Sequence, residues 1–572
     1  MIAGEACETI AGTLVAAATT TKGVRAIEHD GQAIEMPYAW LLSDSLRIAG
    51  ALQIRGLNPG DRVAIVVPEV AGFVRAFLGI TTAGLVPVPL FPPGQAGDVS
   101  TFTRQSRDLL IASQASAVVA SADVAPLLDL EHASTSGHVC QLLTIDALAE
   151  GPALLVPVPV TSDRPALIQF TSGSTAMPKG VVLSHANLHA NLSAIAGPAG
   201  LAIRPDDVGV SWLPLYHDMG LIGALLTSIY ARNDVVIMSP VLFLKRPTAW
   251  LDAISRYRGT VSFAPNFAYE LCLRRVKPSQ IAALDLSSWR VAGCGAEPIR
   301  CDTLESFADR FACTGFRASS FVPSYGLAEH SLAVALATGG VNVDTVDSAR
   351  LVRDSLAVPA SNGAANGHAV RLVGCGRPFP GHEVHIEDET GQLLPDRHVG
   401  RIVARGPSVM AGYFEDPAAT AEALHRGGLE TGDLGYIAEG QLFVCGRTKD
   451  LIIRNGRKYH PPDLESSIAD VDGIRSSNVV VFGISHVNEA DQVVAVLEGR
   501  ASQTSRDIVD QVRRRVRETV GLELDHVLLT PPGTIPRTTS GKVRRSETRA
   551  RFQAGTLLTG GRISLDAPPG SR

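Results

Sequence analysis

Between residues 62 and 322 the chain alternates between short apolar runs and longer segments with helical spacing. The short runs are rich in β-branched and aliphatic residues, which predicts buried strands, and the longer segments repeat apolar positions every three or four residues. Because strands that are apolar on both faces alternate with helices, the pattern predicts an α/β fold of parallel-rich sheets covered by helices. The strand and helix pairs are 62–68 with 71–84, 208–213 with 219–231, 234–239 with 248–257, and 259–265 with 267–276.

A Ser/Thr/Gly-rich stretch, FTSGSTAMPKG at 170–180, follows the strand-like PALIQ at 165–169. Loops at the carboxyl ends of parallel strands form a ligand crevice, so we expect this stretch at that edge. It is not a Walker loop, because the glycine after Gly173 is Gly180, which comes behind Lys179. Its hydroxyls, backbone N–H groups and lysine suit a triphosphate tail that leaves as pyrophosphate, although a surface turn would also explain the stretch taken alone.

The pattern changes twice beyond residue 341. A polar Gly/Ala/Asn-rich stretch at 358–369 is followed by short alternating strands, and a separate α+β pattern begins within 446–465. We therefore expect several units, of which the last moves relative to the first. These are a large N-terminal domain at 1–449, with an insertion at about 342–373 and a small β subdomain at about 374–445, a mobile C-terminal domain at 450–555, and a disordered tail at 556–572.

The composition is that of a soluble protein, with 45% apolar and 19% charged residues among 572 and a net charge of −6. This charge argues against a general nucleic-acid binder. Residues 1–23 place acidic rather than basic residues before a short apolar run, and no apolar segment is long enough to form a transmembrane segment, so a cytoplasmic location is expected. The eight cysteines form no C-x-x-C pair or Cys/His cluster, which favours buried small hydrophobic side chains.

Five further motifs follow the Ser/Thr/Gly-rich stretch in a fixed order: GCGAEP at 293–298, PSYGLAE at 323–329, TGDLGY at 431–436, CGRTKD at 445–450 and PRTTSGK at 536–542. This ordered set resembles the adenylate-forming superfamily of acyl-CoA synthetases, adenylation domains and luciferases, and it spans nearly the whole chain. The resemblance implies ATP and Mg²⁺ as cofactors. A carboxylate would attack the α-phosphorus of ATP, and no general base is needed because the nucleophile is already an anion.

The resemblance also implies roles for individual residues. Glu329 would hold Mg²⁺, and Asp433 would accept hydrogen bonds from the ribose hydroxyls with support from Arg447. Lys542 would swing in with the C-terminal domain about a hinge at Asp450 and neutralise the charge between carboxylate and α-phosphate. The remaining nucleotide-binding residues are Thr171, Ser172, Gly173, Ser174, Thr175 and Lys179 around the phosphates, and Gly295, Ala296, Glu297, Ser324, Tyr325 and Gly326 around the adenine.

Several segments look like one branch of this superfamily, the fatty acyl-AMP ligases. They are WLPLYHDMGLIG at 212–223, APNFAYEL at 264–271, PSYGLAE with Ala328, and GRKYHPPDLE at 456–465, where Lys458 and Pro462 depart from the family pattern. Such enzymes pass a fatty acyl group to the phosphopantetheine thiol of an acyl carrier protein. The resemblance implies a medium or long fatty acid as substrate, leaves an aromatic or hydroxylated acid open, and implies an acyl pocket lined by Tyr216, His217, Asn266 and Phe267.

The resemblance also makes 342–373 the family insertion, which would hinder the domain rotation needed for coenzyme A use. An ordinary solvent loop is the alternative. Residues 452–572 carry 18 Lys/Arg against 14 Asp/Glu, which suits docking of an acidic carrier protein, although RRRVR at 513–517 taken alone is equally a solvated basic face.

Two other functions are compatible with the motifs. A fatty acyl-CoA synthetase would use free coenzyme A as the acceptor, and a catalytically silent nucleotide-binding scaffold would keep only the fold. The second alternative is disfavoured because the charged residues of the motifs are present: Lys179, Glu329, Asp433, Arg447 and Lys542.

Overall fold

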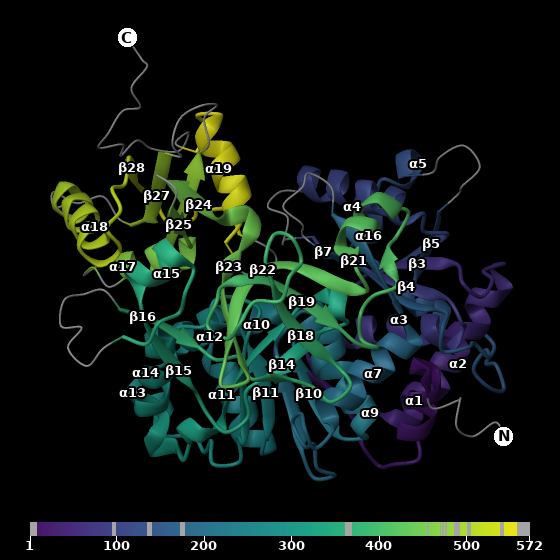
Figure 1. Ribbon diagram of the computed structural model, residues 1–572. Helices are drawn as coiled ribbons and strands as arrows, with labels where there is room; N and C mark the ends of the chain where they lie inside the picture. The colour runs from purple at the N-terminus through teal and green to yellow at the C-terminus, as the bar shows by residue number, and fades with distance from the viewer. Residues whose placement is uncertain are drawn as a thin grey trace.

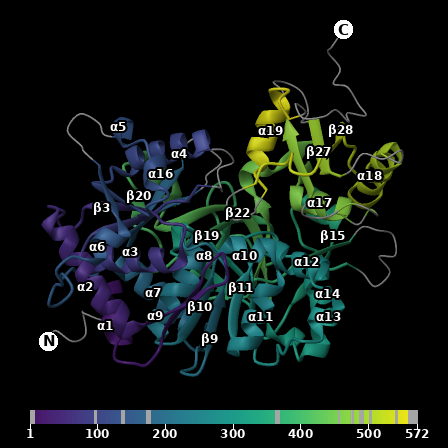
Figure 2. The same ribbon diagram turned by 180° about the vertical axis from the view of Figure 1, so that it is seen from behind.

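The computed structural model describes residues 8–93, 99–133, 140–171, 178–360, 369–454, 457–469, 471, 474, 478–484, 492–499, 505–537 and 543–557. Figure 1 shows a large body of layered sheets and helices that contains the N-terminus, and a smaller body that ends in α18 (Ser505–Val520) and α19 (Arg545–Gln553). The smaller body lies against one end of the large one in both views (Figures 1 and 2).

The largest sheet in the described part of the chain has nine strands, parallel at its centre and antiparallel at both edges. This confirms the predicted α/β class. In sheet order the strands are β17 (Arg377–Pro378), β14 (Ala333–Leu336), β13 (Phe321–Gly326), β12 (Val291–Cys294), β11 (Val261–Ala264), β9 (Val208–Ser211), β10 (Asp234–Met238), β1 (Gly23–Ile27) and β2 (Ala33–Pro37).

Helices connect the strands of this sheet as the apolar periodicity predicts. The segment expected as one helix at 219–231 is helical throughout, but its middle is the π-helix η3 (Leu221–Leu226), which widens the turn. Aromatic side chains such as Trp250, Trp289 and Tyr269 fill the core on the α12 side. The helices are α8 (Asp218–Gly220), α9 (Thr227–Ala231), α10 (Pro240–Lys245), α11 (Thr248–Tyr257), α12 (Asn266–Arg275), α13 (Pro278–Ile281) and α14 (Cys301–Phe311).

A second, fully parallel sheet forms the N-terminal end of the large body. Its strands are β4 (Val86–Pro89), β3 (Arg62–Val66), β5 (Ala117–Ala120) and β6 (Gln141–Thr144). Every residue of β4 and β5 is buried, as expected for strands covered on both faces. The helices of this part are α1 (Ile10–Ala17), α2 (Tyr38–Ile54), α3 (Val70–Thr82), α4 (Val99–Ser113), α5 (Leu130–Ala133) and α6 (Ile145–Ala149).

The Ser/Thr/Gly-rich stretch lies elsewhere than predicted. It connects β7 (Pro165–Thr171) to β8 (Lys179–Ser184), and these strands pair antiparallel in a three-stranded sheet completed by β20 (Gly412–Tyr413). The strands on either side of the stretch therefore form an antiparallel hairpin and not part of a parallel sheet, and residues 172–177 lie outside the described residues. The prediction failed because an apolar strand run carries no information about the direction of its partner. Helix α7 (His185–Ala196) follows β8 and begins with a capping box at Ser184 and Asn187.

A five-stranded antiparallel sheet lies between the large body and the C-terminal residues (Figure 1). Its long strand β22 bends at a register shift between Leu434 and Gly435 and pairs with β23, so that Asp433 lies opposite Arg447. The strands are β18 (Glu383–Glu387), β19 (Gly400–Arg405), β22 (Gly428–Ala438), β21 (Leu424–His425) and β23 (Gln441–Arg447), and α16 (Pro417–Ala423) precedes β21.

The C-terminal residues form their own small α+β unit. A mixed sheet of β26 (Val479–Ile484), β27 (Gln492–Glu498) and β28 (His526–Thr530) packs against α17 (Pro461–Ala469), α18 and α19. A hairpin of β24 (Ile452–Arg454) and β25 (Arg457–Tyr459) connects this unit to β23 through the 3₁₀ turn η7 (Thr448–Asp450).

The residues expected as an insertion form a hairpin with a helix. Strand β15 (Val343–Asp347) pairs with β16 (Ala369–Val373), and α15 (Ser348–Asp354) follows β15 with an N-cap at Asp347. The apolar side chain of Val352 belongs to the same buried cluster as residues of the C-terminal unit. This helix therefore contacts the C-terminal unit directly, as Figure 1 also shows.

Two further expectations concern the whole chain. Of the seven cysteines in the described ranges, all are free and six are buried, which agrees with their interpretation as small hydrophobic side chains. None of the described helices combines the length and the apolar character that crossing a membrane requires.

Candidate active site

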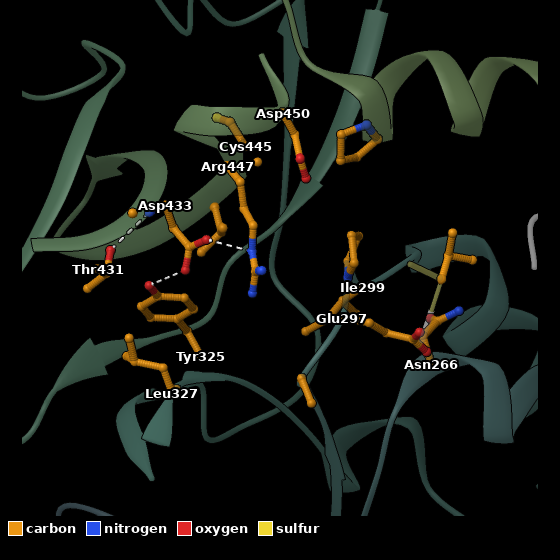
Figure 3. Close-up of a pocket in the computed structure, with 18 of the residues that line it drawn as sticks. Asn266, Glu297, Ile299, Tyr325, Leu327, Thr431, Asp433, Cys445, Arg447 and Asp450 are labelled. Atoms are coloured by element: carbon orange, nitrogen blue, oxygen red, sulfur yellow. Dashed lines mark hydrogen bonds and ion pairs between the residues drawn. The ribbon is translucent and has the colours of Figure 1, made fainter. Parts of the chain in front are cut away.

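A cavity of about 1750 Å³ separates the nine-stranded sheet, the five-stranded sheet and the C-terminal unit. Figure 3 shows part of its lining, with Tyr325, Asp433 and Arg447 at one side and Asn266 and Glu297 at the other. The cavity thus brings together residues from motifs more than 200 positions apart. The predicted residues that line it are Thr171, Lys179, His217, Asn266, Phe267, Ala296, Glu297, Ser324, Tyr325, Gly326, Glu329, Asp433, Arg447 and Asp450.

Some predicted residues are not among those that line the cavity. Tyr216 and Gly295 lie next to lining residues without lining it themselves. Others lie outside the described residues: Ser172, Gly173, Ser174 and Thr175 of the Ser/Thr/Gly-rich stretch, and Lys542 of the PRTTSGK motif.

The carboxylate of Asp433 is held by two partners. The hydroxyl of Tyr325, on β13, donates to its Oδ2 at 2.7 Å, and Arg447 Nε lies 3.3 Å from its Oδ1 (Figure 3). The Asp433 side chain is 13% exposed, whereas that of Arg447 is 60% exposed. Burial raises the pKa of Asp433, and the Arg447 charge and the Tyr325 hydrogen bond oppose that rise. This carboxylate can accept two hydrogen bonds from a vicinal diol, since it is fixed on strands and both of its oxygens are acceptors.

A tight turn follows β12 and fixes the wall beside Tyr325. A Cβ at Gly295 would lie 2.4 Å from Ser324 Oγ and 2.9 Å from Ser324 O, so only glycine fits there. Ala296 then adopts a left-handed conformation with φ of 68°. Glu297 Oε1 accepts from the Phe267 N–H at 2.6 Å, which ties the turn to the first residues of α12. The GCGAEP motif therefore shapes the wall through its backbone.

Tyr413 connects two predicted phosphate-end residues. Its hydroxyl donates to Glu329 Oε1 at 2.9 Å, and Lys179 Nζ lies 4.8 Å from the centroid of its ring. It reaches both because β20 pairs with β8, the strand that begins at Lys179. Sequence reasoning missed Tyr413, since nothing in its local sequence GYFED signals a site and only long-range strand pairing places it.

Glu329 lies in a buried environment that disfavours its charged form. Burial raises the pKa of this carboxyl, as does the nearby Asp218, while its own backbone N–H and the Tyr413 hydroxyl lower it. No group of three His, Cys, Asp or Glu side chains converges as a metal-ligand set within the described ranges. A single carboxylate suits Mg²⁺ that also takes phosphate oxygens and water, because Mg²⁺ usually binds few protein ligands. The residues therefore fit a magnesium–nucleotide complex.

A second residue missed by sequence reasoning is Gln169 on β7. It is buried and lines the cavity, and its Nε2 donates to the backbone oxygen of Tyr216 at 2.8 Å. This bond fixes the segment that carries His217 into the cavity wall. On the opposite wall, Asn266 Oδ1 accepts from the Arg300 N–H at 3.0 Å.

The predicted hinge residue takes part in a buried ion cluster. Asp450 Oδ2 lies 2.8 Å from Arg545 Nη1, and Glu465 Oε1 lies 2.7 Å from Arg545 Nη2. Arg545 Nε also donates to the backbone oxygen of Val481 at 2.9 Å. The end of β23 is thereby tied to α17, β26 and α19 of the C-terminal unit.

Taken together, a carboxylate fixed on strands and a lysine near a second, buried carboxylate lie in one large cavity, an arrangement compatible with a nucleotide site. Comparison with known proteins agrees. A family model described as AMP-binding enzyme matches residues 14–414, and a second, described as the AMP domain of Disco-interacting protein 2-like proteins, matches residues 449–560.

Comparison with individual proteins narrows the family further. The chain is 37% identical to a Caulobacter vibrioides protein whose provisional name is acyl-CoA synthetase, over 96% of each chain. It is 34% identical to the medium-chain-fatty-acid–[acyl-carrier-protein] ligase JamA of Moorena producens, over 91% of this chain and 90% of that one. A structure solved in a study of fatty acyl-adenylate ligases from E. coli and L. pneumophila has a TM-score of 0.89 and 36% identity, covering 96% of this chain and 99% of that one.

The chain belongs to the AMP-binding enzyme family, and within it to the fatty acyl-AMP ligases. The resemblance stated from the motifs and the predicted fold class are both confirmed.

The pKa of Glu329 predicts how kcat/KM falls at low pH. Because burial raises the pKa of Glu329, its carboxylate is lost at a higher pH than for an exposed glutamate as the pH falls. The Tyr413→Phe variant removes a hydrogen bond that lowers this pKa, so the acid limb of kcat/KM should move to higher pH. Pyrophosphate release measured across pH at subsaturating ATP tests this.

Asp433 also has a raised pKa, and Tyr325→Phe serves as the matched variant because it removes the tyrosine hydrogen bond to that carboxylate. If the acid limb moves in Tyr325→Phe and stays in place in Tyr413→Phe, the limb belongs to Asp433 and the assignment to Glu329 is wrong.

Proposed function

We propose that this protein uses ATP to convert a fatty acid to its acyl-adenylate, releases pyrophosphate, and passes the acyl group to the phosphopantetheine thiol of an acyl carrier protein. The observation that carries the proposal is one cavity lined at one end by Asp433, Arg447 and Glu329 and at another by aliphatic side chains. The similarity to a fatty-acid–carrier-protein ligase and to fatty acyl-adenylate ligases supports the same reaction.

In the first step a carboxylate oxygen of the acid forms a bond to the α-phosphorus, and the bond from that phosphorus to the oxygen bridging to the β-phosphate breaks. The electron pair leaves with pyrophosphate, so no proton need be moved. Positioning and charge are what the protein contributes. We assign ribose binding to Asp433 with Arg447, adenine contact to Tyr325, and phosphate contact to Lys179 with residues 171–175.

When bound, Mg²⁺ neutralises charge on the phosphate oxygens, and Glu329 is the side chain we assign to hold it. The Tyr413 hydroxyl keeps one Glu329 oxygen oriented, since it donates to that oxygen at 2.9 Å. Lys542 supplies the remaining positive charge between the carboxylate and the α-phosphate. The described residue that follows it, Val543, lines the cavity, which supports this role.

In the second step the thiolate sulfur attacks the acyl carbon, and AMP leaves. We propose that the C-terminal domain, residues 450–555, turns about Asp450 relative to residues 1–449 to admit the thiol. An acidic carrier protein would meet the basic residues of α18, of which Arg514 and Arg517 are exposed. The predicted cytoplasmic location stays a prediction.

The insertion at 342–373 is proposed to limit that turn. Arg371 of β16 pairs with Asp302 of α14 at 2.6 Å, which attaches the hairpin to the large body. On the other side Ser348 Oγ donates to the backbone oxygen of Thr519 at 3.2 Å, and Val352 is 7% exposed in the C-terminal cluster. A solvent loop would have no such contacts, so this segment is suited to resist rotation.

Product analysis tests the function. With ATP, Mg²⁺ and a panel of fatty acids, mass spectrometry should detect acyl-AMP, loading of a phosphopantetheinylated carrier protein, and little acyl-CoA when free coenzyme A is the acceptor. Efficient acyl-CoA formation would establish the acyl-CoA synthetase alternative instead. Absence of pyrophosphate release with every acid would leave only a nucleotide-binding scaffold.

Replacing the proposed catalytic lysine separates chemistry from binding. Lys542→Ala should lower the rate of acyl-adenylate formation by on the order of 10²–10³-fold, as loss of one preorganised charge-stabilising group does. ATP affinity, measured by calorimetry, should stay nearly unchanged. A variant that releases pyrophosphate at a near-normal rate would show that Lys542 has no such role.

Weakening the insertion contact should change acceptor use. Val352→Asp places a carboxylate in the C-terminal cluster, and the lost contact should raise acyl-CoA formation by about tenfold, which corresponds to roughly 1.4 kcal/mol. Acyl-adenylate formation should change little. Arg350→Ala is the matched control, because Arg350 lies on the same helix and pairs with Asp354 of that helix. Equal acyl-CoA rates in the two variants would contradict the restraint.

A further inference from the structure

One branch of the cavity is lined by aliphatic and aromatic side chains. Its lining there comes from α7, the loop after α7, β11 and β14, and the side chains pack as one aliphatic and aromatic cluster. The lining members are Ile195, Leu201, Phe263, Leu332, Ala333 and Leu336. This branch therefore suits the alkyl chain of the acid, given the proposed function.

A second and much smaller cavity, about 40 Å³, lies directly behind this branch. Four residues line both cavities and so form the wall between them: Leu201, Met219, Gly223 and Phe263. Since about 10–15 Å³ of such volume holds one water-sized group, the second cavity has room for a few heavy atoms. It is a space of the size by which neighbouring fatty acids differ.

Several polar side chains that line the small cavity are engaged within the protein: Asp207 pairs with Arg290, and Ser262 Oγ donates to the Val210 oxygen at 2.6 Å. Thr227 Oγ1 donates to the Ile222 oxygen at 2.8 Å, and Ser211 Oγ accepts from the Leu213 N–H at 3.1 Å. The Thr227 hydroxyl needs no partner from a ligand, whereas Asn233, which also lines this cavity, has a buried Oδ1 with no hydrogen-bond partner among the described residues, so the space is not wholly apolar.

The two sides of the wall differ in stiffness. Phe263 pairs with Gly293 of the adjacent strand, and a Cβ at Gly293 would lie 2.0 Å from Phe263 Cδ1, so the ring occupies the space above that glycine. Such a ring cannot move without displacing the sheet. Met219 is partly buried, as Phe263 is, but its unbranched side chain has more rotamers available.

The opposite side of the wall is left open by Gly223 in the π-helix η3. A Cβ there would lie 3.0 Å from Leu332 Cδ2 and 3.8 Å from Met219 Cγ, which is close contact with both neighbours. A methyl group added at this position would narrow the passage between the two cavities.

We propose that the wall of Leu201, Met219, Gly223 and Phe263 sets the longest fatty acid that the enzyme activates, with Met219 as the specificity-determining side chain and Gly223 as the opening beside it. Acids whose terminal methyl stops at the wall bind well, and longer acids must displace Met219 to reach the small cavity.

Two variants with opposite expected effects test the wall. Met219→Ala should join the cavities and raise kcat/KM for acids longer than the native optimum by about tenfold relative to that optimum, the usual size of discrimination by a methylene in a hydrophobic pocket. Gly223→Ala should lower kcat/KM for the longest accepted acids by about tenfold and spare shorter ones. Acyl-AMP formation from a homologous series of straight-chain acids gives both profiles.

Met238→Ala is the matched control, because Met238 is equally a methionine in the core but lines neither cavity. It should leave the chain-length profile unchanged even if it lowers stability. If the native enzyme activates members of the series and both wall variants keep its chain-length profile, then the wall does not set the chain length, while the proposed function is unaffected. If the native enzyme activates no acid of the series, the proposed function fails and the wall fails with it.

Discussion

The largely buried guanidinium of Arg545 holds the predicted hinge residue Asp450 against the C-terminal unit, at the boundary between the two bodies. It lies between the carboxylates of Asp450 and Glu465 and is 18% exposed, so removing either carboxylate would leave part of its charge uncompensated in a poorly hydrated place. Burial raises the pKa of Glu465, and Arg545 opposes this rise. Because Asp450 ends η7 and Arg545 begins α19, this ion cluster ties the turn that follows β23 to the C-terminal unit.

That sheet in turn connects the two ends of the nucleotide site. Strand β22 carries Asp433 and β23 carries Arg447, while Tyr325 approaches from β13 of the nine-stranded sheet. The proposed movement of the C-terminal unit about Asp450 would begin only three residues after Arg447. The proposed nucleoside site is therefore held by strands, and the proposed hinge lies directly beside it, where the second substrate would enter.

The hairpin of β15 and β16, together with α15, adds a second contact at the same boundary. Asp344 of β15 accepts from Tyr436 at 2.8 Å and pairs with Arg397 at 2.9 Å, so the hairpin is attached to the five-stranded sheet as well as to α14. Its helix meets the C-terminal unit through Val352 and Ser348. The proposed rotation of the C-terminal unit would have to break these contacts, and an aliphatic side chain gives up buried area when it does so.

The sequence by itself determined the α/β class, the order of the motifs and the family, because strand and helix periodicities and motif spacings are local properties of the chain. Local patterns also located Asp433, Tyr325 and Glu329 in their motifs. Only the tertiary structure decided that β7 and β8 form an antiparallel hairpin, that Tyr413 joins Lys179 to Glu329, and that Val352 enters the C-terminal cluster. Each of these depends on pairing or packing between distant segments, which no local pattern specifies.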